Sequence, residues 1–214
     1  MWDLHYTIFI QERKVSMKRF YVALLAMVLA LPALAGYDYI ITDSMNFGDL
    51  SITNNQSILI NGGEGHHLNL FYYSSAIINK TEPLMSEGYG GIWQIMAGDY
   101  TKIEISGGEI HHLEVTAFAQ AKISGGQIEF LGSSQGATQQ LKYIELVCQS
   151  GYAYNSTTGF LSGLWGDGSA FNIRLINVAG YSPTIDNIKF TIIPEPATML
   201  LLGLGGLLLR RKSS

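Results

Sequence analysis

The sequence predicts an all-β protein whose middle forms a short parallel β-solenoid of about 18 residues per coil. Three features support this fold: an internal repeat, a ladder of apolar residues with the same period, and glycine pairs at a fixed place in the repeat. The repeat reads INGGEGHHL at 60–68, ISGGEIHHL at 105–113 and ISGGQI at 123–128. The last two copies are one period apart, and the first two are separated by two periods plus a short insertion.

An apolar ladder emerges when the chain is aligned on this period. Alternating apolar and polar residues predict strands that turn one face inward. A single coil cannot bury its apolar face, whereas coils stacked about 4.8 Å apart bury a continuous core. The chain has room for about four to five coils, more than the roughly three that such a stack needs; an antiparallel β-sandwich is the competing fold. The aligned positions are Leu50, Leu68, Ile95, Leu113 and Leu131, and, in the second strand of each coil, Ile60, Ile78, Ile105 and Ile123.

The glycine pairs follow the second strand of a coil, at 62–63, 107–108 and 125–126. We expect turns there that a Cβ atom would obstruct. The insertion falls within 81–92, where a proline and several glycines predict a loop that bulges from one coil. These features assign residues 36–137 to the repeats.

The regular period is lost after the repeats, and residues 138–193 are predicted to form a C-terminal β cap or a small β module. The ends of a solenoid have to be blocked against edge pairing, which gives such a cap its purpose. The predicted strands are 141–148, 171–177 and 185–193, with a turn at 165–168 and a polar loop at 152–158.

The N-terminal region contains a secretory signal peptide over residues 17–35. A basic start (MKR) precedes an apolar stretch at 20–31, which predicts a signal helix. Ala33 and Ala35 form a cleavage site of small residues, so the mature chain is expected to begin at Gly36.

Residues 1–16 precede this signal and look like neither a signal nor a domain. The stretch contains several charged side chains, which a signal peptide would not carry ahead of its basic start. We interpret it as a mis-called extension, with Met17 as the true start; a genuine N-terminal extension is the alternative.

The C-terminal segment, 194–214, combines a short polar motif, an apolar run and a basic end. Such a run partitions into hydrocarbon, while the basic cluster after it stays cytoplasmic. It predicts a hydrophobic helix shorter than the roughly 17–25 residues of a comfortable span, so snorkelling and local thinning have to cover the deficit. A buried core helix is the alternative, which the glycines and the missing polar face argue against. The parts of the segment are Pro194, Glu195 and Pro196, the run 197–209, and Arg210, Arg211 and Lys212.

The two ends together resemble PEP-CTERM proteins, a class of bacterial exported proteins with a Sec signal peptide. The resemblance rests on PEPAT at 194–198, the apolar run and RRK at 210–212, and it covers only the segment 194–214 of the chain. It implies recognition, and cleavage near Pro194–Pro196, by an exosortase, a membrane-embedded cysteine transpeptidase-like enzyme. The implied partners are exosortase and the Sec machinery, with the C-terminal segment holding the protein transiently in the inner membrane.

The class is linked to Gram-negative-type bacteria that make exopolysaccharide or biofilm matrix. The resemblance therefore implies a final place in the cell envelope, on the outer surface or outside the cell, with exopolysaccharide as a further candidate partner. The same motif is also named after ice-binding proteins, a label that carries no activity here. The repeats at 36–137 resemble, less specifically, glycine-rich passengers of this class.

The passenger between the two signals, residues 36–194, excludes several classes of partner by its charge. It carries six Lys and Arg against 14 Asp and Glu, a net charge of −8, which argues against nucleic acid and anionic membrane surfaces as partners.

The single cysteine of the passenger, Cys148, has no internal partner for a disulfide. Since Cys148 ends a predicted strand and lacks an evident histidine partner, we expect a buried side chain rather than a catalytic thiol.

Paired histidines at 66–67 and 111–112, with Glu64, Glu109 and Glu114 nearby, invite a metal-site interpretation. Adjacent residues on a strand point to opposite faces, so neither pair is expected to chelate an ion. The two pairs are also predicted to lie two coils, about 9.6 Å, apart, whereas zinc ligands lie about 2.0–2.2 Å from the ion. The sequence therefore predicts no metal and no other cofactor, with adventitious surface binding as the alternative.

The passenger lacks the residue pattern of a β-helix polysaccharide lyase or hydrolase. Such sites need paired carboxylates, or a basic cluster with metal-binding acids. Here acids occur mostly once per coil, and Arg174 is the one arginine of the passenger. We therefore expect no enzyme. Ice binding typically uses Thr-x-Thr ladders, and this repeat contains none.

Carbohydrate binding is harder to exclude, because aromatic residues gather near the predicted insertion loop. Trp93 and Tyr89 are the candidate ligand-binding residues, although aromatic residues usually pack in part against the protein. Further candidates are Tyr72, Tyr73, Tyr100 and Trp165.

The sequence thus predicts an exported, non-enzymatic protein of the cell envelope or extracellular matrix, with a structural or adhesive passenger. A carbohydrate-binding module of the exopolysaccharide matrix is the alternative. A polysaccharide-degrading β-helix enzyme and an ice-binding protein are less favoured interpretations.

Overall fold

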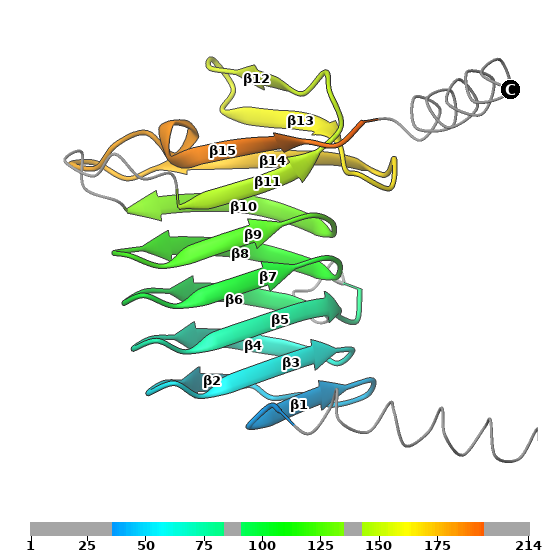
Figure 1. Cartoon of the computed structure of the whole chain (residues 1–214), viewed down its shortest axis with the longest axis vertical. Helices are drawn as coiled ribbons and strands as arrows, with labels where there is room; N and C mark the ends of the chain where they lie inside the picture. The colour runs from blue at the N-terminus through cyan, green and yellow to red at the C-terminus, as the bar shows by residue number, and fades with distance from the viewer. Residues whose placement is uncertain (1–35, 84–90, 135–142, 195–214) are drawn as a thin grey trace, which may run out of the picture. The chain divides into compact units, whose positions relative to one another are not determined.

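Two mostly parallel β-sheets form the described part of the protein, and the chain passes repeatedly from one to the other (Figure 1). The computed structural model describes residues 36–83, 91–134 and 143–194. All the strands lie in the unit that begins at Asp38, and the unit before it ends at Tyr37. The predicted extension, the signal peptide and the tail from residue 195 onward lie outside the described residues.

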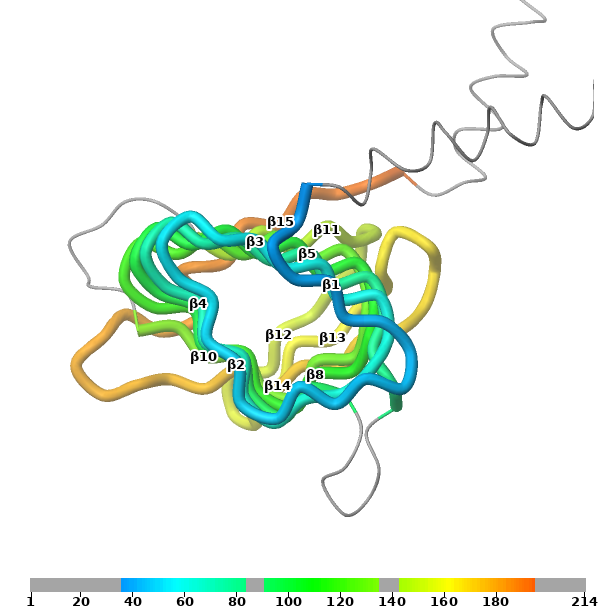
Figure 2. The backbone as a smooth tube through the Cα atoms, turned by 90° about the horizontal axis from the view of Figure 1, so that it is seen from below, coloured from blue at the N-terminus to red at the C-terminus, as the bar shows by residue number. Residues whose placement is uncertain are grey.

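The first sheet has seven strands, and all of its pairs are parallel. The second has eight, of which the last three pair antiparallel. Figure 2 shows successive strands of each sheet lying one behind the other around a common interior. In order, the first sheet contains β1 (Tyr39–Thr42), β3 (Ser57–Asn61), β5 (Ser75–Lys80), β7 (Lys102–Ile105), β9 (Gln120–Ile123), β11 (Ile144–Cys148) and β15 (Ile188–Ile192). The second contains β2 (Asp49–Ile52), β4 (Gly65–Leu70), β6 (Ile92–Ala97), β8 (Glu109–Thr116), β10 (Gln127–Ser134), β14 (Ala170–Asn177), β13 (Phe160–Leu164) and β12 (Ala153–Asn155).

Neighbouring strands pair the residues that alignment on the repeat period places together. In the first sheet Ile105 on β7 pairs with Ile123 on β9. In the second, Leu113 on β8 pairs with Leu131 on β10. Because the step is the same in both sheets, each apolar column stays on the inward side from one strand to the next.

The inserted residues lie in the connection between β5 and β6. Leu68 on β4 still pairs with Ile95 on β6, although the chain between them is longer than one period, so the insertion does not disturb the pairing. Residues 84–90 of this connection lie outside the described residues. Thr81 at its start is buried, and its Oγ1 accepts a hydrogen bond of 2.8 Å from the backbone N–H of Glu109, which ties the connection to β8.

The core consists of inward-facing aliphatic side chains stacked in columns between the two sheets. β7 and β9 alternate between exposed and buried residues, as strands with one inward face require. Full burial of one such side chain contributes about 1.5–3 kcal/mol, so the columns are the main source of stability. The ladder members that are at most 1% exposed are Leu68, Ile95, Leu113 and Leu131, and Ile60, Ile78, Ile105 and Ile123.

Residues 143–194 extend both sheets and add an antiparallel hairpin. β14 pairs parallel with β10, and β15 pairs parallel with β11, so a strand lies within each of the predicted ranges 141–148, 171–177 and 185–193. The third range was wrong at its start, because 185–187 belong to a 3₁₀ helix and β15 begins at Ile188. The predicted polar loop at 152–158 was wrong in part, because β12 forms within it and pairs with β13. Asn155 closes the hairpin: its Oδ1 accepts hydrogen bonds from the backbone N–H groups of Thr157 and Thr158, at 3.0 and 3.2 Å.

Trp165 joins this region to the repeats. Its side chain is fully buried, and its Nε1–H donates a hydrogen bond of 2.9 Å to the carbonyl oxygen of Gly126. Its ring packs on Phe171, with 4.3 Å between the centroids. Trp165 is therefore a packing residue, and its candidacy as an exposed stacking platform was wrong.

A buried polar network attaches the short 3₁₀ helix η1 (Thr184–Asn187) to β10 and β14. The backbone N–H of Ser133 donates to Thr184 Oγ1 at 3.1 Å, and Asn187 Nδ2 donates to Ser133 Oγ at 3.0 Å. Thr184 Oγ1 in turn donates to the carbonyl oxygen of Ile176. Each polar group has a partner, as buried polar groups require.

The glycine pairs occupy turns in which adjacent turns of the chain approach closely, as the sequence predicts. A Cβ atom on Gly125 would lie 2.2 Å from the carbonyl oxygen of Ser106, and Gly126 has a φ of +89°. A side chain at the first position meets backbone, which cannot move without breaking the pairing of neighbouring strands.

Replacing Gly125 with alanine is expected to destabilise the protein by about 1–3 kcal/mol, the cost of forcing an additional carbon into a packed site. Gly132 is the matched control, because a Cβ atom there meets its nearest neighbour at 3.6 Å, an ordinary contact. Chemical denaturation of both variants checks this. Equal midpoints for Gly125→Ala and Gly132→Ala would contradict the close approach at the turn.

Cys148 is fully buried at the end of β11, which confirms the expected packing role. Burial raises the pKa of its thiol, so the reactive thiolate is disfavoured at neutral pH. We expect no reaction with an aromatic disulfide reagent at pH 8 under native conditions, and one equivalent of reaction in denaturant. Rapid labelling of the native protein would show that β11 is accessible.

Candidate functional site

The predicted sorting motif begins directly after the last strand. β15 ends at Ile192, and the backbone N–H of Ile193 still donates to the carbonyl oxygen of Cys148 at 2.9 Å. Pro194 follows and is exposed. All the described strands therefore precede the motif, so cleavage next to it would leave both sheets intact.

The remaining residues of the two sorting signals lie outside the described part of the chain. At the N-terminal signal, Gly36 is described as an exposed turn residue, whereas Ala33 and Ala35 are outside. Outside it as well are Glu195 and Pro196, the apolar run 197–209, and Arg210 and Arg211. Among the residues described, no helix has both the length and the apolar character needed to cross a membrane.

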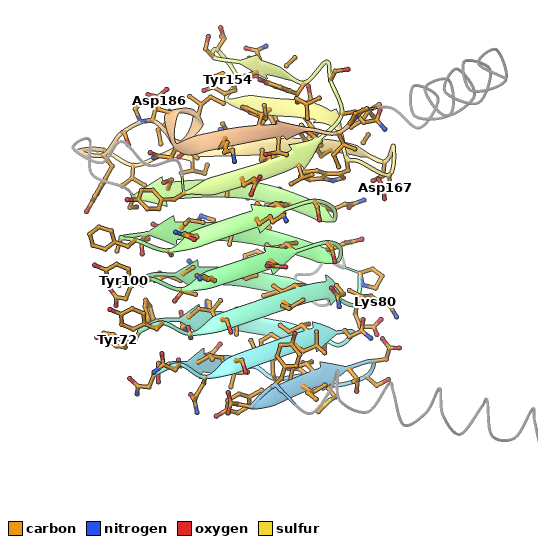
Figure 3. The ribbon with its side chains drawn as sticks, viewed as in Figure 1. Tyr72, Lys80, Tyr100, Tyr154, Asp167 and Asp186 are labelled. Atoms are coloured by element: carbon orange, nitrogen blue, oxygen red, sulfur yellow. The ribbon has the colours of Figure 1, made fainter. Side chains whose placement is uncertain are left out.

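A stack of exposed aromatic rings runs along the turns between the two sheets, and we call Tyr73, Tyr100 and Phe118 the aromatic ladder. The ring centroids of Tyr73 and Tyr100 lie 5.1 Å apart with planes 5° from parallel, and those of Tyr100 and Phe118 lie 4.7 Å apart at 6°. In Figure 3, Tyr72 and Tyr100 project from the same edge of the sheets. The ladder residues follow β4, β6 and β8, at the same place in each repeat.

Stacking determines what the aromatic ladder can bind. Both faces of Tyr100 are covered by neighbouring rings, and Tyr73 and Phe118 each have one face covered, so these faces are closed to a sugar. The ladder therefore stabilises the turns and presents a polar-edged stripe. It does not offer a row of open platforms.

Trp93, one of the two candidate ligand-binding residues, is half-buried on β6. It stacks on His111 of the neighbouring β8, with centroids 3.8 Å apart and planes 8° from parallel. His111 Nε2 lies 3.5 Å from a carboxylate oxygen of Glu129 on β10, and Phe130 packs edge-on against the imidazole at 5.1 Å. One face of Trp93 is thus used within the protein. Tyr89, the other candidate, lies outside the described residues.

An open groove runs between β8, β10 and the start of β14. Its lining combines polar residues, two of them carboxylates, with apolar ones that include the buried Phe171. Sequence spacing did not indicate this groove, because β14 does not follow the repeat. The lining residues are Glu109, Gln127, Ile128, Glu129, Ala170, Phe171 and Asn172.

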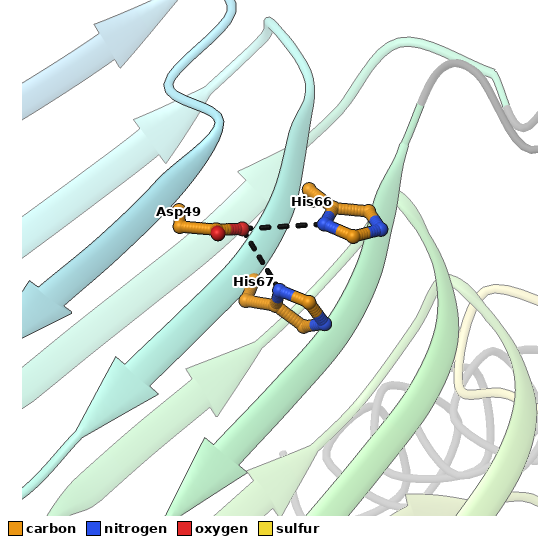
Figure 4. Close-up of side chains that lie close together, drawn as sticks. All are labelled: Asp49, His66 and His67. Atoms are coloured by element: carbon orange, nitrogen blue, oxygen red, sulfur yellow. Dashed lines mark hydrogen bonds and ion pairs between the residues drawn. The ribbon is translucent and has the colours of Figure 1, made fainter.

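Two adjacent histidines converge on one carboxylate at the start of the second sheet, and we call Asp49, His66 and His67 the histidine–aspartate cluster (Figure 4). Asp49 Oδ1 lies 3.2 Å from His66 Nδ1 and 2.8 Å from His67 Nδ1, and the two imidazole centroids are 4.0 Å apart. These hydrogen bonds, that of His67 first, hold the pKa of Asp49 below its usual value.

The expectation that neighbouring histidines point to opposite faces was therefore wrong at 66–67. The backbone N–H groups of both residues donate to the same carbonyl oxygen, that of Gly48, at 2.7 and 3.1 Å, so the chain is not regularly pleated there. Gly65 permits this path, because a Cβ atom on it would lie 1.9 Å from the ring of Phe47. The alternation rule holds only for a regular strand.

The second histidine pair does not form an equivalent cluster. His111 stacks on Trp93, and His112 approaches Phe130 at 6.4 Å. His112 pairs with Gln94 on the preceding strand, whereas His67 pairs with Asp49. Asp49 lies one repeat period before His67. Alignment on that period would have placed the two residues next to each other on neighbouring strands.

Comparisons with known proteins identify the C-terminal segment. Residues 193–212 match the family model of the PEP-CTERM protein-sorting motif, which confirms the resemblance seen in the sequence. The motif supports a secreted protein that is sorted by an exosortase and is anchored at the membrane before processing. Comparisons with curated proteins and with solved structures found no match.

Replacing Tyr100 with alanine removes both stacked contacts of the aromatic ladder. Since each aromatic pair contributes about 0.5–1.5 kcal/mol, we expect a loss of about 1–3 kcal/mol in the free energy of unfolding. Tyr181 is the control, because it is similarly exposed and takes part in none of the ring contacts among the described residues. Denaturant titration distinguishes them; equal stability of the two variants would contradict a structural role for the ladder.

Proposed function

We propose that this chain is an exported, non-enzymatic protein that exosortase releases to the cell envelope or the extracellular matrix, where its passenger is structural or adhesive. The observation that carries the proposal is the sorting motif at residues 193–212. The placement of Pro194 directly after β15 supports it, because processing there would separate the tail from an intact pair of sheets.

The passenger is proposed to be a parallel β-solenoid over residues 36–137, closed by a C-terminal β cap over 138–193. The support is the step of one repeat period that recurs between paired positions in both sheets on either side of the insertion, and the alternation of the chain between the sheets. In such a stack each coil contacts only its neighbours, and the outward residues form columns along its length.

A structural or adhesive role fits the outward-facing residues, many of which contact one another along the stack. The aromatic ladder joins neighbouring turns, and the stack of Trp93 on His111 joins β6 to β8. Outward charges form exposed ion pairs such as Lys80 with Asp43, at 2.8 Å. The passenger's net charge of −8 keeps it soluble and directs it away from polyanions.

A carbohydrate-binding module is the second candidate, and the open groove beside β14 is the observation that favours it. Two carboxylates and two side-chain amides there could hydrogen-bond sugar hydroxyls. Binding of exopolysaccharide to the wild type that is lost in Asn172→Ala would favour this role over a purely structural one.

The sorting proposal is tested by intact mass and cell fractionation in the native host, with wild type beside a variant in which Pro194, Glu195 and Pro196 are alanine. We expect a wild-type product that begins at Gly36, ends near Pro194 and is released or attached to the surface. The variant is expected to keep its tail and stay in the membrane.

The matched control replaces three exposed residues of the β12–β13 hairpin, Ser156, Thr157 and Thr158, with alanine. Its product should have the same ends as the wild type. If wild type and the motif variant both keep the tail and fractionate alike, the sorting proposal fails.

A further inference from the structure

The histidine–aspartate cluster brings three metal-ligating groups from two neighbouring strands to one point. Asp49 opens β2, His66 and His67 open β4, and Asp49 pairs with His67 in the register of the sheet. One ligand atom from each residue lies within 4.8 Å of the other two. The side chains are 68%, 58% and 33% exposed, in that order, so an ion can reach them directly from solvent.

Two of the three separations within the cluster are close to those of a coordination sphere. Tetrahedral zinc with Zn–N and Zn–O bonds of about 2.0–2.1 Å places adjacent ligand atoms about 3.3 Å apart. The two observed separations from Asp49 Oδ1 to an imidazole Nδ1 are 3.2 and 2.8 Å. Small side-chain rotations would therefore admit an ion between the three groups.

We propose that Asp49, His66 and His67 bind a divalent transition-metal ion, with zinc as the reference ion and water in the remaining coordination position. Two imidazoles and one carboxylate favour zinc, nickel or copper, whereas magnesium and calcium prefer sites made of oxygen atoms. Binding through Nδ1 places the ring proton of each histidine on Nε2. The ion would then replace the two hydrogen bonds to Asp49.

The backbone holds both ligand-bearing strands in place before any ion arrives. The carbonyl oxygen of Gly48 accepts from both histidine N–H groups, which fixes the start of β4 next to Asp49. The turn before Asp49 is fixed as well: Asn46 Oδ1 accepts from the Gly48 N–H at 2.9 Å, and Asn46 Nδ2 donates to Glu64 at 2.7 Å. Outer contacts of this kind orient metal ligands and raise affinity.

The repeat itself supplies an internal comparison. His111 and His112 stand at the same place two strands further along, but the residues before them on the neighbouring strand are Trp93 and Gln94. That pair has no carboxylate in Asp49's position, and although Glu129 approaches His111, the described residues bring no third ligand close to both histidines. The proposal therefore assigns binding to one histidine pair and not to the other.

Calorimetric titration of Zn²⁺ into the metal-free full chain in detergent micelles tests the proposal. We expect one equivalent to bind the wild type, and at least a tenfold loss of affinity in His67→Ala and in Asp49→Asn, because each removes one of three protein ligands. His112→Ala is the matched control and should bind as the wild type does. Mg²⁺ should give no binding.

A second measurement separates loss of a ligand from loss of the fold. Co²⁺ in place of Zn²⁺ should give the strong visible absorption of a four-coordinate site in the wild type and lose it in His67→Ala. Asp49→Asn is nearly isosteric with the wild type, and its metal-free unfolding midpoint should be unchanged. Wild-type affinity in both cluster variants, or an equal loss in His112→Ala, would overturn the proposal independently of the sorting result.

Discussion

The register between neighbouring strands is the constraint on which the rest of the structure depends. Side chains alternate across a strand, so a slip of one residue would turn an inward column outward. Both sheets have to keep the same step along the chain, as the pairs Ile105–Ile123 and Leu113–Leu131 do. The glycine turns let the chain pass from one sheet to the other while neighbouring turns stay close together. The additional residues between β5 and β6 leave the pairing of β4 with β6 unchanged.

The sequence predicted the part of the fold in which one set of contacts is copied. A repeat places chemically similar residues at equal intervals, so aligning Leu68, Ile95 and Leu113 was enough to identify residues that pair across strands. The hairpin of β12 and β13 was missed because β12 is only three residues long, and because the pairing of β13 depends on β14, which lies outside the repeat. The burial of Trp165 likewise rests on Gly126, which is far from it in the sequence.

The same distinction applies to the candidate sites: one could be recognised from the sequence, and the other depends on contacts made in the fold. The tail was recognised because a sorting signal is read as a contiguous stretch, so no folded contact was needed to see Pro194 and the residues after it. The histidine–aspartate cluster was missed because the alternation of an ideal strand was applied to a place where two N–H groups share the carbonyl oxygen of Gly48. Local backbone geometry, which a residue pattern does not carry, brought the two imidazoles to one side.

The recurring step of one repeat period also determines how the passenger can change in length. Each repeat unit contributes one strand to each sheet, so duplicating one unit would raise the stack by one strand spacing, about 4.8 Å. The contacts at β1 and those of the C-terminal hairpin would stay as they are, because each unit contacts only its neighbours. Tandem duplication of a short stretch of gene would thus adjust the height of the stack in equal increments, with no redesign of the sorting signal that follows it.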